Sequence, residues 1–310
     1  MNVSERLAHS LLSNPRADRV KAVAGLARRS ARTARGLFLA EGPQNVREAL
    51  MAHGRSGADS IPQLNAVYVT PSCMERHPDI AKLVEAVLEA DSQLPRVFLR
   101  MVTDDVLQAM CATQNPQGAV AVCTIASPTV DAALRRVEDS GPTEPARLIA
   151  ILCRLQDPGN AGAIIRAADA AGADAVVLTH GSVDVYNPKT VRSTAGSLFH
   201  LPVVTHADFS ELVNATEVTG IQRLGADGYA ELDLDVLQDS VAMGKSAPCD
   251  LTAPTAWLFG HEAQGLSEQE KSVTQRIAVP LYGQAESLNV ATAAALCLYA
   301  SARAQRRVLS

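Results

Sequence analysis

The sequence has few aromatic residues and no long apolar run. Phenylalanine, tryptophan and tyrosine make up 4% of the 310 residues, so helix packing on small side chains such as alanine is expected. A transmembrane helix needs about eighteen consecutive apolar residues, and no such stretch occurs. Residues 1–30 contain several arginines but no apolar run of signal-peptide length. We therefore expect a cytoplasmic protein that makes no contact with a membrane.

Metal-binding and redox motifs are also missing. The six cysteines never form a C-x-x-C pair, and thiols spread through a cytoplasmic chain of this length need no disulfide bonds. His261 lies in a loop without further ligands at metal-binding spacing. We expect no metal site and assign no chemistry to the cysteines, which are Cys73, Cys111, Cys123, Cys153, Cys249 and Cys297.

Basic charge is scarce overall but concentrated at the start of the chain. Residues 1–36 hold eight Lys/Arg and two acids, a charge of +6, whereas 20 basic and 31 acidic residues give the remainder −11. A basic segment on an acidic body can contact phosphates, although a solvated helical face explains the same pattern equally well. We predict that residues 1–36 form a basic N-terminal helical arm.

The next segments predict an α/β domain followed by a linker. Between residues 37 and 126, strand candidates at 66–70, 96–100 and 119–125 alternate with helical patterns. The chain then changes character over 127–146, which contains Ser140-Gly-Pro-Thr-Glu-Pro145. We predict a smaller α/β domain over 37–126 and a linker over 127–146.

Strand-like runs return over 147–310, with helical stretches between most of them. This alternation predicts an α/β domain with a mostly parallel sheet that is covered by helices on both faces. The strand candidates are 148–153, 175–179, 201–204, 221–225, 255–260 and 277–280.

The first chemically suggestive segment is Asp157-Pro-Gly-Asn160 with the helix that follows it. Asn160 is a candidate helix cap, and Arg166 can project with it toward the carboxyl end of the preceding strand, where open α/β sheets bind ligands. The alternative is an ordinary crossover helix with an exposed arginine. Gly159 and Gly162 do not form G-x-G-x-x-G, which argues against a nucleotide-dependent dehydrogenase.

Two further loops carry polar residues beside glycines or helix starts. In Phe259-Gly-His-Glu-Ala-Gln-Gly-Leu-Ser267, the glycines permit close backbone approach, Glu262 can meet a ligand, and Ser267 is a natural helix cap. Ser287 and Asn289 stand before an alanine-rich helix over 290–303, where free backbone amides gather. The alternatives are a solvated turn for Glu262 and a plain helix cap for Ser287.

Taken in order, these segments resemble the SpoU (TrmH) family of the SPOUT class of methyltransferases. The resemblance covers residues 148–307 through D-P-x-N-x-G-A-x-x-R, G-x-E-x-x-G-L-S, I-x-V-P-x-x-G-x-x-x-S-L-N-V and a terminal Arg-Ala-Gln-Arg. The first half is similar to the small substrate-binding domain of this family, opening at Phe38-Leu-Ala-Glu-Gly42. The domains are then an RNA-binding domain over 37–126 and a methyltransferase domain over 147–310.

The resemblance implies an enzyme that methylates ribose 2'-hydroxyls of RNA with S-adenosylmethionine. It also implies a deep trefoil knot in the C-terminal domain and a homodimer whose active site lies at the subunit interface. The cofactor-binding positions correspond to Ala226, Gly260, Val279 and Leu288. The catalytic positions correspond to Asn160, Arg166, Glu262, Ser287 and Asn289.

The identity of the RNA rests on analogy. Ribosomal RNA is favoured because a separate N-terminal domain is present, and Arg154 is a further candidate for RNA contact. The alternatives are a tRNA-directed methyltransferase and an RNA-binding module of the same fold without turnover. The nucleotide that is methylated, and whether methylation confers antibiotic resistance, stay open.

Overall fold

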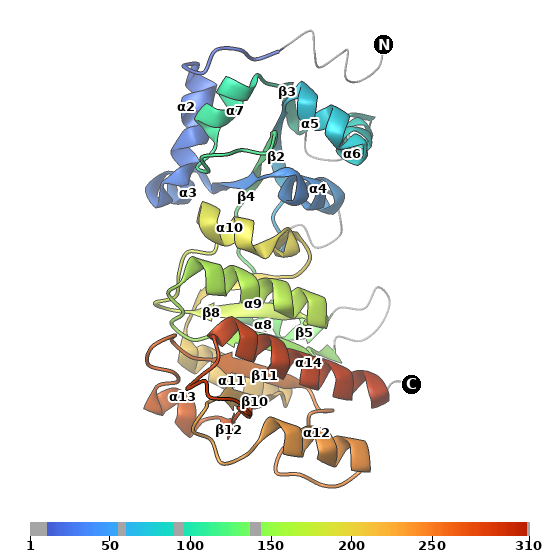
Figure 1. Cartoon of the computed structure of the whole chain (residues 1–310), viewed down its shortest axis with the longest axis vertical. Helices are drawn as coiled ribbons and strands as arrows, with labels where there is room; N and C mark the ends of the chain where they lie inside the picture. The colour runs from blue at the N-terminus through green and yellow to red at the C-terminus, as the bar shows by residue number, and fades with distance from the viewer. Residues whose placement is uncertain (1–10, 55–59, 90–95, 137–143, 309–310) are drawn as a thin grey trace. The chain divides into compact units, whose positions relative to one another are not determined.

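The chain folds into two compact units. The computed structural model describes residues 11–54, 60–89, 96–136 and 144–308. The first unit contains the described residues up to Ala126 together with Asp184–His200, and the second contains the described residues of the rest of the chain. Figure 1 shows the elements of both. The first unit therefore takes a segment from the second half of the sequence, which the sequence patterns did not predict.

The first unit is built on a four-stranded sheet in the order β1-β4-β2-β3. Strands β2 (Leu64–Val69), β3 (Phe98–Met101) and β4 (Ala119–Thr124) lie near the predicted strands, whereas β1 (Leu37–Glu41) was not predicted. Strand β4 pairs antiparallel with β1 and β2, and β2 pairs parallel with β3. The helices between β1 and β4 are α4 (Pro43–Ala52), α5 (Pro71–Arg76), α6 (Pro78–Glu89) and α7 (Asp104–Met110).

The described part of the basic segment packs into this unit instead of forming a separate arm. Helices α2 (Asp18–Ala24), η1 (Gly25–Ala27) and α3 (Arg29–Arg35) follow one another. Val20, Val23 and Leu26 belong to the core that contains residues of β1, β2 and β4, because apolar side chains recur at helical spacing between the arginines. Residues 1–10 of the predicted arm lie outside the described residues.

The segment Asp184–His200 is held in the first unit by buried contacts. It contains α10 (Pro188–Thr194) and η2 (Ser197–Phe199). Arg192 donates to the Glu41 carboxylate over 2.7 Å, and that carboxylate is 2% exposed. The rings of Tyr186 and Phe199 pack against Phe38. A charged and an aromatic contact thus join residues that are far apart in sequence.

The second unit is a six-stranded sheet in the order β12-β10-β11-β7-β8-β9, in which every pairing is parallel. This confirms the predicted parallel sheet; the deep trefoil knot stays a prediction. The strands are β7 (Leu148–Leu152), β8 (Ala175–Thr179), β9 (Val203–Ala207), β10 (Gln222–Ala226), β11 (Thr255–Phe259) and β12 (Gln275–Ile277).

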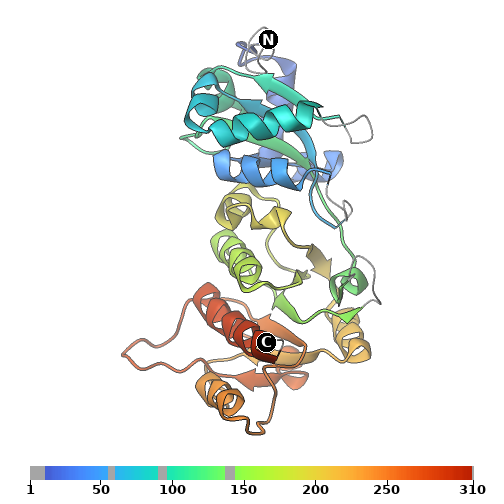
Figure 2. The ribbon, with the colours of Figure 1, turned by 90° about the vertical axis from the view of Figure 1, so that its right-hand side faces the viewer.

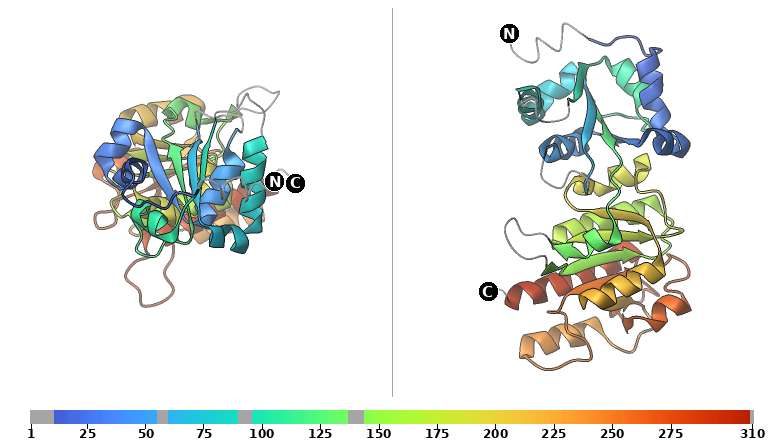
Figure 3. Two further views of the ribbon diagram at one scale, coloured as in Figure 1. Left: turned by 90° about the horizontal axis from the view of Figure 1, so that it is seen from above. Right: turned by 180° about the vertical axis from the view of Figure 1, so that it is seen from behind.

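Helices cover both faces of this sheet. Helices α9 (Pro158–Ala171) and α14 (Val290–Val308) contact each other and β7, while α8 (Val130–Ala133) and α11 (Phe209–Thr219) contact each other across the sheet from them (Figures 2 and 3). Two more helices follow the later strands, α12 (Leu234–Met243) and α13 (Glu268–Ser272). Among the described residues, none of the helices is long and apolar enough to cross a bilayer.

The predicted linker is largely part of the second unit. Val130, Leu134 and Ala146 are buried in the core formed with the strands of the parallel sheet. The short strands β5 (Arg135–Arg136) and β6 (Glu144–Pro145) pair with each other beside it, and residues 137–143 lie outside the described residues. The apolar positions of α8, which the sequence shows as an amphipathic patch, explain why the segment packs.

Candidate active site at the carboxyl ends of the parallel strands

The three motif loops meet at one edge of the sheet. Each leaves the carboxyl end of a parallel strand: residues 153–157 follow β7, residues 260–267 follow β11, and residues 278–289 follow β12. Because parallel strands end at the same edge, their loops converge there, which is the usual ligand-binding position in open α/β folds. The sheet therefore brings together segments that are more than a hundred residues apart.

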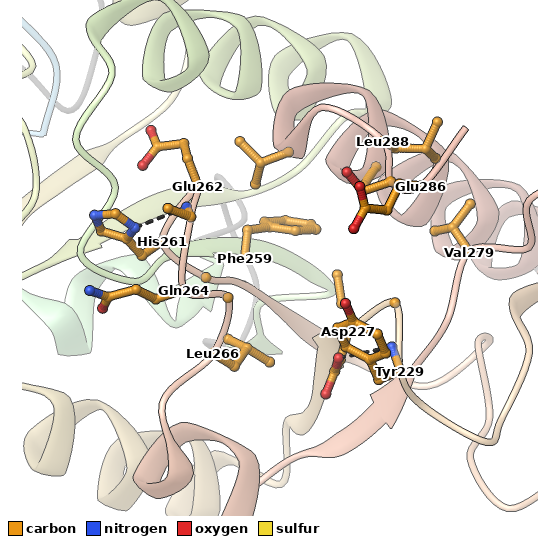
Figure 4. Close-up of a pocket in the computed structure, with 18 of the residues that line it drawn as sticks. Asp227, Tyr229, Phe259, His261, Glu262, Gln264, Leu266, Val279, Glu286 and Leu288 are labelled. Atoms are coloured by element: carbon orange, nitrogen blue, oxygen red, sulfur yellow. Dashed lines mark hydrogen bonds between the residues drawn. The ribbon is translucent and has the colours of Figure 1, made fainter. Parts of the chain in front are cut away.

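A cavity of about 400 Å³ lies at this edge, between residues 226–229 after β10 and the loops after β11 and β12. Ala226, Gly260, Val279 and Leu288, the four predicted cofactor-binding residues, all line it. In Figure 4, His261 and Glu262 lie on one side, Val279, Glu286 and Leu288 lie on the other, and the Phe259 ring lies between them. Further lining residues include Asp227, Tyr229, Leu266, Lys271, Glu286 and the predicted Ser287. Asp227, Tyr229 and Glu286 were missed, although each stands within three positions of a predicted residue.

The loop after β11 folds tightly on itself. His261 and Gly265 exchange both backbone hydrogen bonds, at 3.1 and 2.8 Å. A Cβ atom on Gly260 would lie 2.2 Å from the Gly265 carbonyl carbon, and Gly265 has a φ of +66°, a region that glycine adopts readily. The expected close backbone approach at these two glycines is confirmed. Ser267 caps α13 through a capping box with Glu270, also as expected.

Glu262 connects the β11 loop to the β7 loop. Its carboxylate accepts hydrogen bonds from the backbone N–H groups of Gln156 and Asp157, the latter at 2.8 Å. Partial burial tends to raise the pKa of Glu262, but the backbone donors outweigh burial and hold this pKa below its usual range. The side chain, although exposed, is therefore an ionised group at neutral pH that is anchored to the β7 loop.

Two asparagines extend this connection to the third loop. The Asn160 amide donates to Glu262 at 3.5 Å and accepts a 3.0 Å hydrogen bond from the Asn289 amide. The Asn289 oxygen accepts from the backbone of Ala291 and Thr292 at the start of α14. Three of the predicted catalytic residues thus form one network, Glu262–Asn160–Asn289, across the three loops.

The candidate cap Asn160 and the alternative cap Ser287 are both wrong, by three and two residues. Asp157, not Asn160, caps α9, because its carboxylate accepts from the Asn160 backbone N–H at 2.8 Å. Asn289, not Ser287, caps α14. In both cases the capping side chain stands directly before the first helical residue, Pro158 or Val290, so the residues inside the helix or further upstream cannot take that position.

Comparison with known proteins identifies the family. Residues 147–299 match the SpoU rRNA methylase family, and residues 17–121 match the MRM3-like substrate binding domain. The chain is 34% identical, over 72% of its length and 82% of the relative, to the 23S rRNA (guanosine(2553)-2'-O)-methyltransferase RlmP of Bacillus subtilis. The chain belongs to the SpoU rRNA methylase family.

Two further proteins resemble the chain over nearly its whole length. An uncharacterised tRNA/rRNA methyltransferase of Synechocystis is 32% identical over 92% of this chain and 91% of the relative. The structure of the SpoU methyltransferase AviRb of Streptomyces viridochromogenes in complex with the cofactor AdoMet is 27% identical and superposes with a TM-score of 0.73, covering 95% of this chain and all of the other. Both units therefore have counterparts in the family.

The cavity fits the cofactor of SpoU enzymes, S-adenosylmethionine. Phe259, Leu266 and Leu288 provide apolar surface for an adenine ring, and the loop backbones provide polar atoms. The Glu286 carboxylate at the cavity carries a charge opposite to that of the cationic sulfonium. Within the described ranges, no three His, Cys, Asp or Glu side chains lie close enough to hold a metal ion.

Arg166 is the predicted site residue that belongs neither to the cavity lining nor to the Glu262–Asn160–Asn289 network. It lies on α9 six positions after Asn160, is exposed, and is absent from the cavity lining. Among the described residues it makes no hydrogen bond or ion pair. Arg154, predicted as an RNA contact, forms a bidentate ion pair with Glu270, a partner 116 positions away that local sequence patterns could not show.

Proposed function

We propose that this chain transfers a methyl group from S-adenosylmethionine to a ribose 2'-hydroxyl of ribosomal RNA in the cytoplasm. The observation that carries the proposal is the position of the Glu262–Asn160–Asn289 network at the edge of the cavity, through the shared residue Glu262. The name of the Bacillus subtilis relative and the AdoMet complex of the Streptomyces relative support the same reaction.

The network and Arg166 supply positioning in this proposal. When bound, S-adenosylmethionine supplies an electrophilic methyl group, and alignment of the attacking hydroxyl with it can contribute roughly 7–11 kcal/mol. Asn160 and Asn289 hold each other's amides in fixed orientation and so can orient the ribose, while Ser287 lines the cavity two positions before Asn289. An arginine side chain offers a planar fork of donors that can hold phosphate oxygens, so we assign Arg166 to clamp the phosphate and position the hydroxyl.

We further propose that the active enzyme is a homodimer. A groove of about 740 Å³ between α12, α14 and residues 279–288 is mostly apolar, and Leu296 and Tyr299 on its α14 side are 46% and 52% exposed. The segment before α14 extends away from the unit (Figures 2 and 3). Apolar surface of this kind commonly marks an interface. In this dimer, a second copy of the chain covers the groove. Arg166 of one chain does not line its own cavity, and the partner chain supplies its Arg166 there.

The reaction is tested by incubating the protein with radiolabelled S-adenosylmethionine and either ribosomal RNA or tRNA. We expect label in ribosomal RNA, resistant to alkaline cleavage at one 2'-O-methylated position. Label in tRNA alone would redirect the substrate assignment. Tight RNA binding without label in either RNA would favour the binding module over the enzyme.

The basic surface of α2 and α3 is expected to strengthen RNA binding. Arg32 is buried and paired, and Arg35 donates to a backbone carbonyl, but Arg16, Arg28 and Arg29 are exposed. Changing these three to glutamine should weaken RNA binding and reduce the slope of log K against log salt by about two, because each phosphate contact contributes about 0.7–0.9. Filter binding at several salt concentrations measures this.

The control for this prediction is Lys82→Gln on α6, which removes an exposed charge elsewhere in the first unit and should leave the slope unchanged. Point changes are preferable to deletion of residues 1–36, since Val20, Val23 and Leu26 are core residues. An unchanged slope in the triple variant would contradict a phosphate role for this surface.

A further inference from the structure

Arg154 has a backbone conformation that its side chain does not favour. Its φ is +55°, one of three positive values among the described non-glycine residues. Residues with a Cβ atom adopt this left-handed region at an energetic cost, and such positions often have a functional reason. The Arg154 N–H donates to the Thr179 hydroxyl at 3.1 Å, which fixes the backbone directly after β7.

The Arg154 side chain reaches across to the loop after β11. Its Nε and Nη2 atoms donate to the two Glu270 carboxylate oxygens at 3.0 and 2.8 Å. The same guanidinium donates to the Gly265 carbonyl oxygen at 3.2 Å and to the Gln264 side-chain oxygen at 3.4 Å. One planar group therefore bonds to three residues of the loop that lines the cavity and of its following helix.

The Glu270 carboxylate is buried and depends on the Arg154 guanidinium as its cationic partner. Its side chain is 6% exposed, and its carboxylate also accepts from the Ser267 backbone N–H at 2.6 Å. Burial tends to raise the pKa of Glu270, but the bonds from Arg154 and Ser267 hold it below its usual range. A buried carboxylate left without its cation is strongly unfavourable, so the loop must shift when Arg154 is removed.

We infer that Arg154 and Glu270 are positioning residues that hold the 260–267 loop in the shape required to bind S-adenosylmethionine. The pair fixes the loop at Gly265 and at the start of α13, while Glu262 fixes it to Gln156 and Asp157. The loop held by these two attachments contains Gly260 and Leu266, which line the cavity. The inference rests on the proposed use of this cavity for the methyl donor.

The test compares Arg154→Met, Arg154→Lys and Glu270→Gln by calorimetric titration with S-adenosylmethionine and with S-adenosylhomocysteine. Arg154→Met keeps an unbranched apolar side chain but removes the guanidinium and its charge. We expect it to weaken both ligands about tenfold or more, as loss of a charge-assisted hydrogen bond can. Arg154→Lys should restore only part of the affinity, because an ammonium cannot make the bidentate contact.

Steady-state kinetics separate positioning from general destabilisation. We expect the KM for S-adenosylmethionine to rise while the KM for RNA and kcat at saturating cofactor stay near wild type. A smaller folded fraction would lower kcat without moving KM. The double variant Arg154→Met/Glu270→Gln should be no weaker than the worse single variant, because residues acting through each other are not additive.

The matched control is Arg135→Met, which breaks the ion pair of Arg135 with Asp131 on α8 and should leave cofactor affinity unchanged. Unchanged affinity in folded Arg154→Met, or additive effects of the two changes, would overturn the inference. If the wild-type protein itself failed to bind either ligand, the proposed function would be at fault instead.

Discussion

Arg166→Ala is expected to lower kcat for RNA methylation by about a thousandfold, comparable to removing a group that acts mainly in the transition state. The affinity for S-adenosylmethionine should stay within about twofold of wild type, because Arg166 is exposed on α9 and absent from the cavity lining. Single-turnover methyl transfer and calorimetry measure the two quantities separately.

Two further variants make this result specific. Arg166→Lys should recover little activity, since a lysine ammonium lacks the planar fork that can hold a phosphate and a hydroxyl together. Arg135→Ala, which removes a β5 arginine that is ion-paired with Asp131 on α8, should methylate RNA normally. A wild-type rate in Arg166→Ala would mean that Arg166 is an ordinary exposed helix residue and that the assigned mechanism is wrong.

A mixture of two inactive variants should regain activity. Leu288→Arg places a bulky cation in the cavity. It should abolish cofactor binding, because the side chain fills space and repels the cationic sulfonium. Arg166→Ala keeps the cavity but lacks the clamp. In a heterodimer of the two, one site combines an intact cavity with an intact Arg166 from the other subunit. After random subunit exchange in a two-fold dimer, the mixture should reach about a quarter of the wild-type rate.

Light scattering and subunit exchange, followed with differently tagged chains, are the controls for this experiment. The homodimer should be present at micromolar concentration, and each variant alone should remain dimeric. If heterodimers form and the mixture stays inactive, each active site takes Arg166 from its own chain. A fully active monomer would contradict the dimer proposal altogether.

Periodicity and loop chemistry predicted the parallel sheet and the loops at its carboxyl edge. Those features are encoded locally, by apolar runs such as Leu148–Leu152 and by glycines beside them. The positions of Ala226, Gly260, Val279 and Leu288 around one cavity followed from the family resemblance, because strand order cannot be derived from a single sequence.

Other features depend on competition between nearby capping residues or on contacts between residues that are far apart in the sequence. Local sequence patterns contain neither. Asp157 displaces Asn160 as a cap because it stands three residues earlier, next to Pro158. The partner of Arg154 is 116 positions away, and β1 gains its place by pairing with β4. Local propensity cannot determine such contacts, since the fold brings the partners together.

The Asp184–His200 segment has a consequence for folding during synthesis. Domains generally fold from the N-terminus as the chain leaves the ribosome. Here Glu41 can contact Arg192 only after 151 further residues have been synthesised. In the same way, Phe38 can pack against Phe199 only once that residue has been synthesised. By then β7 and β8, which belong to the second unit, have already emerged. The first unit can therefore complete its core only after synthesis of the second unit has begun. Folding of the two units must overlap in time during translation.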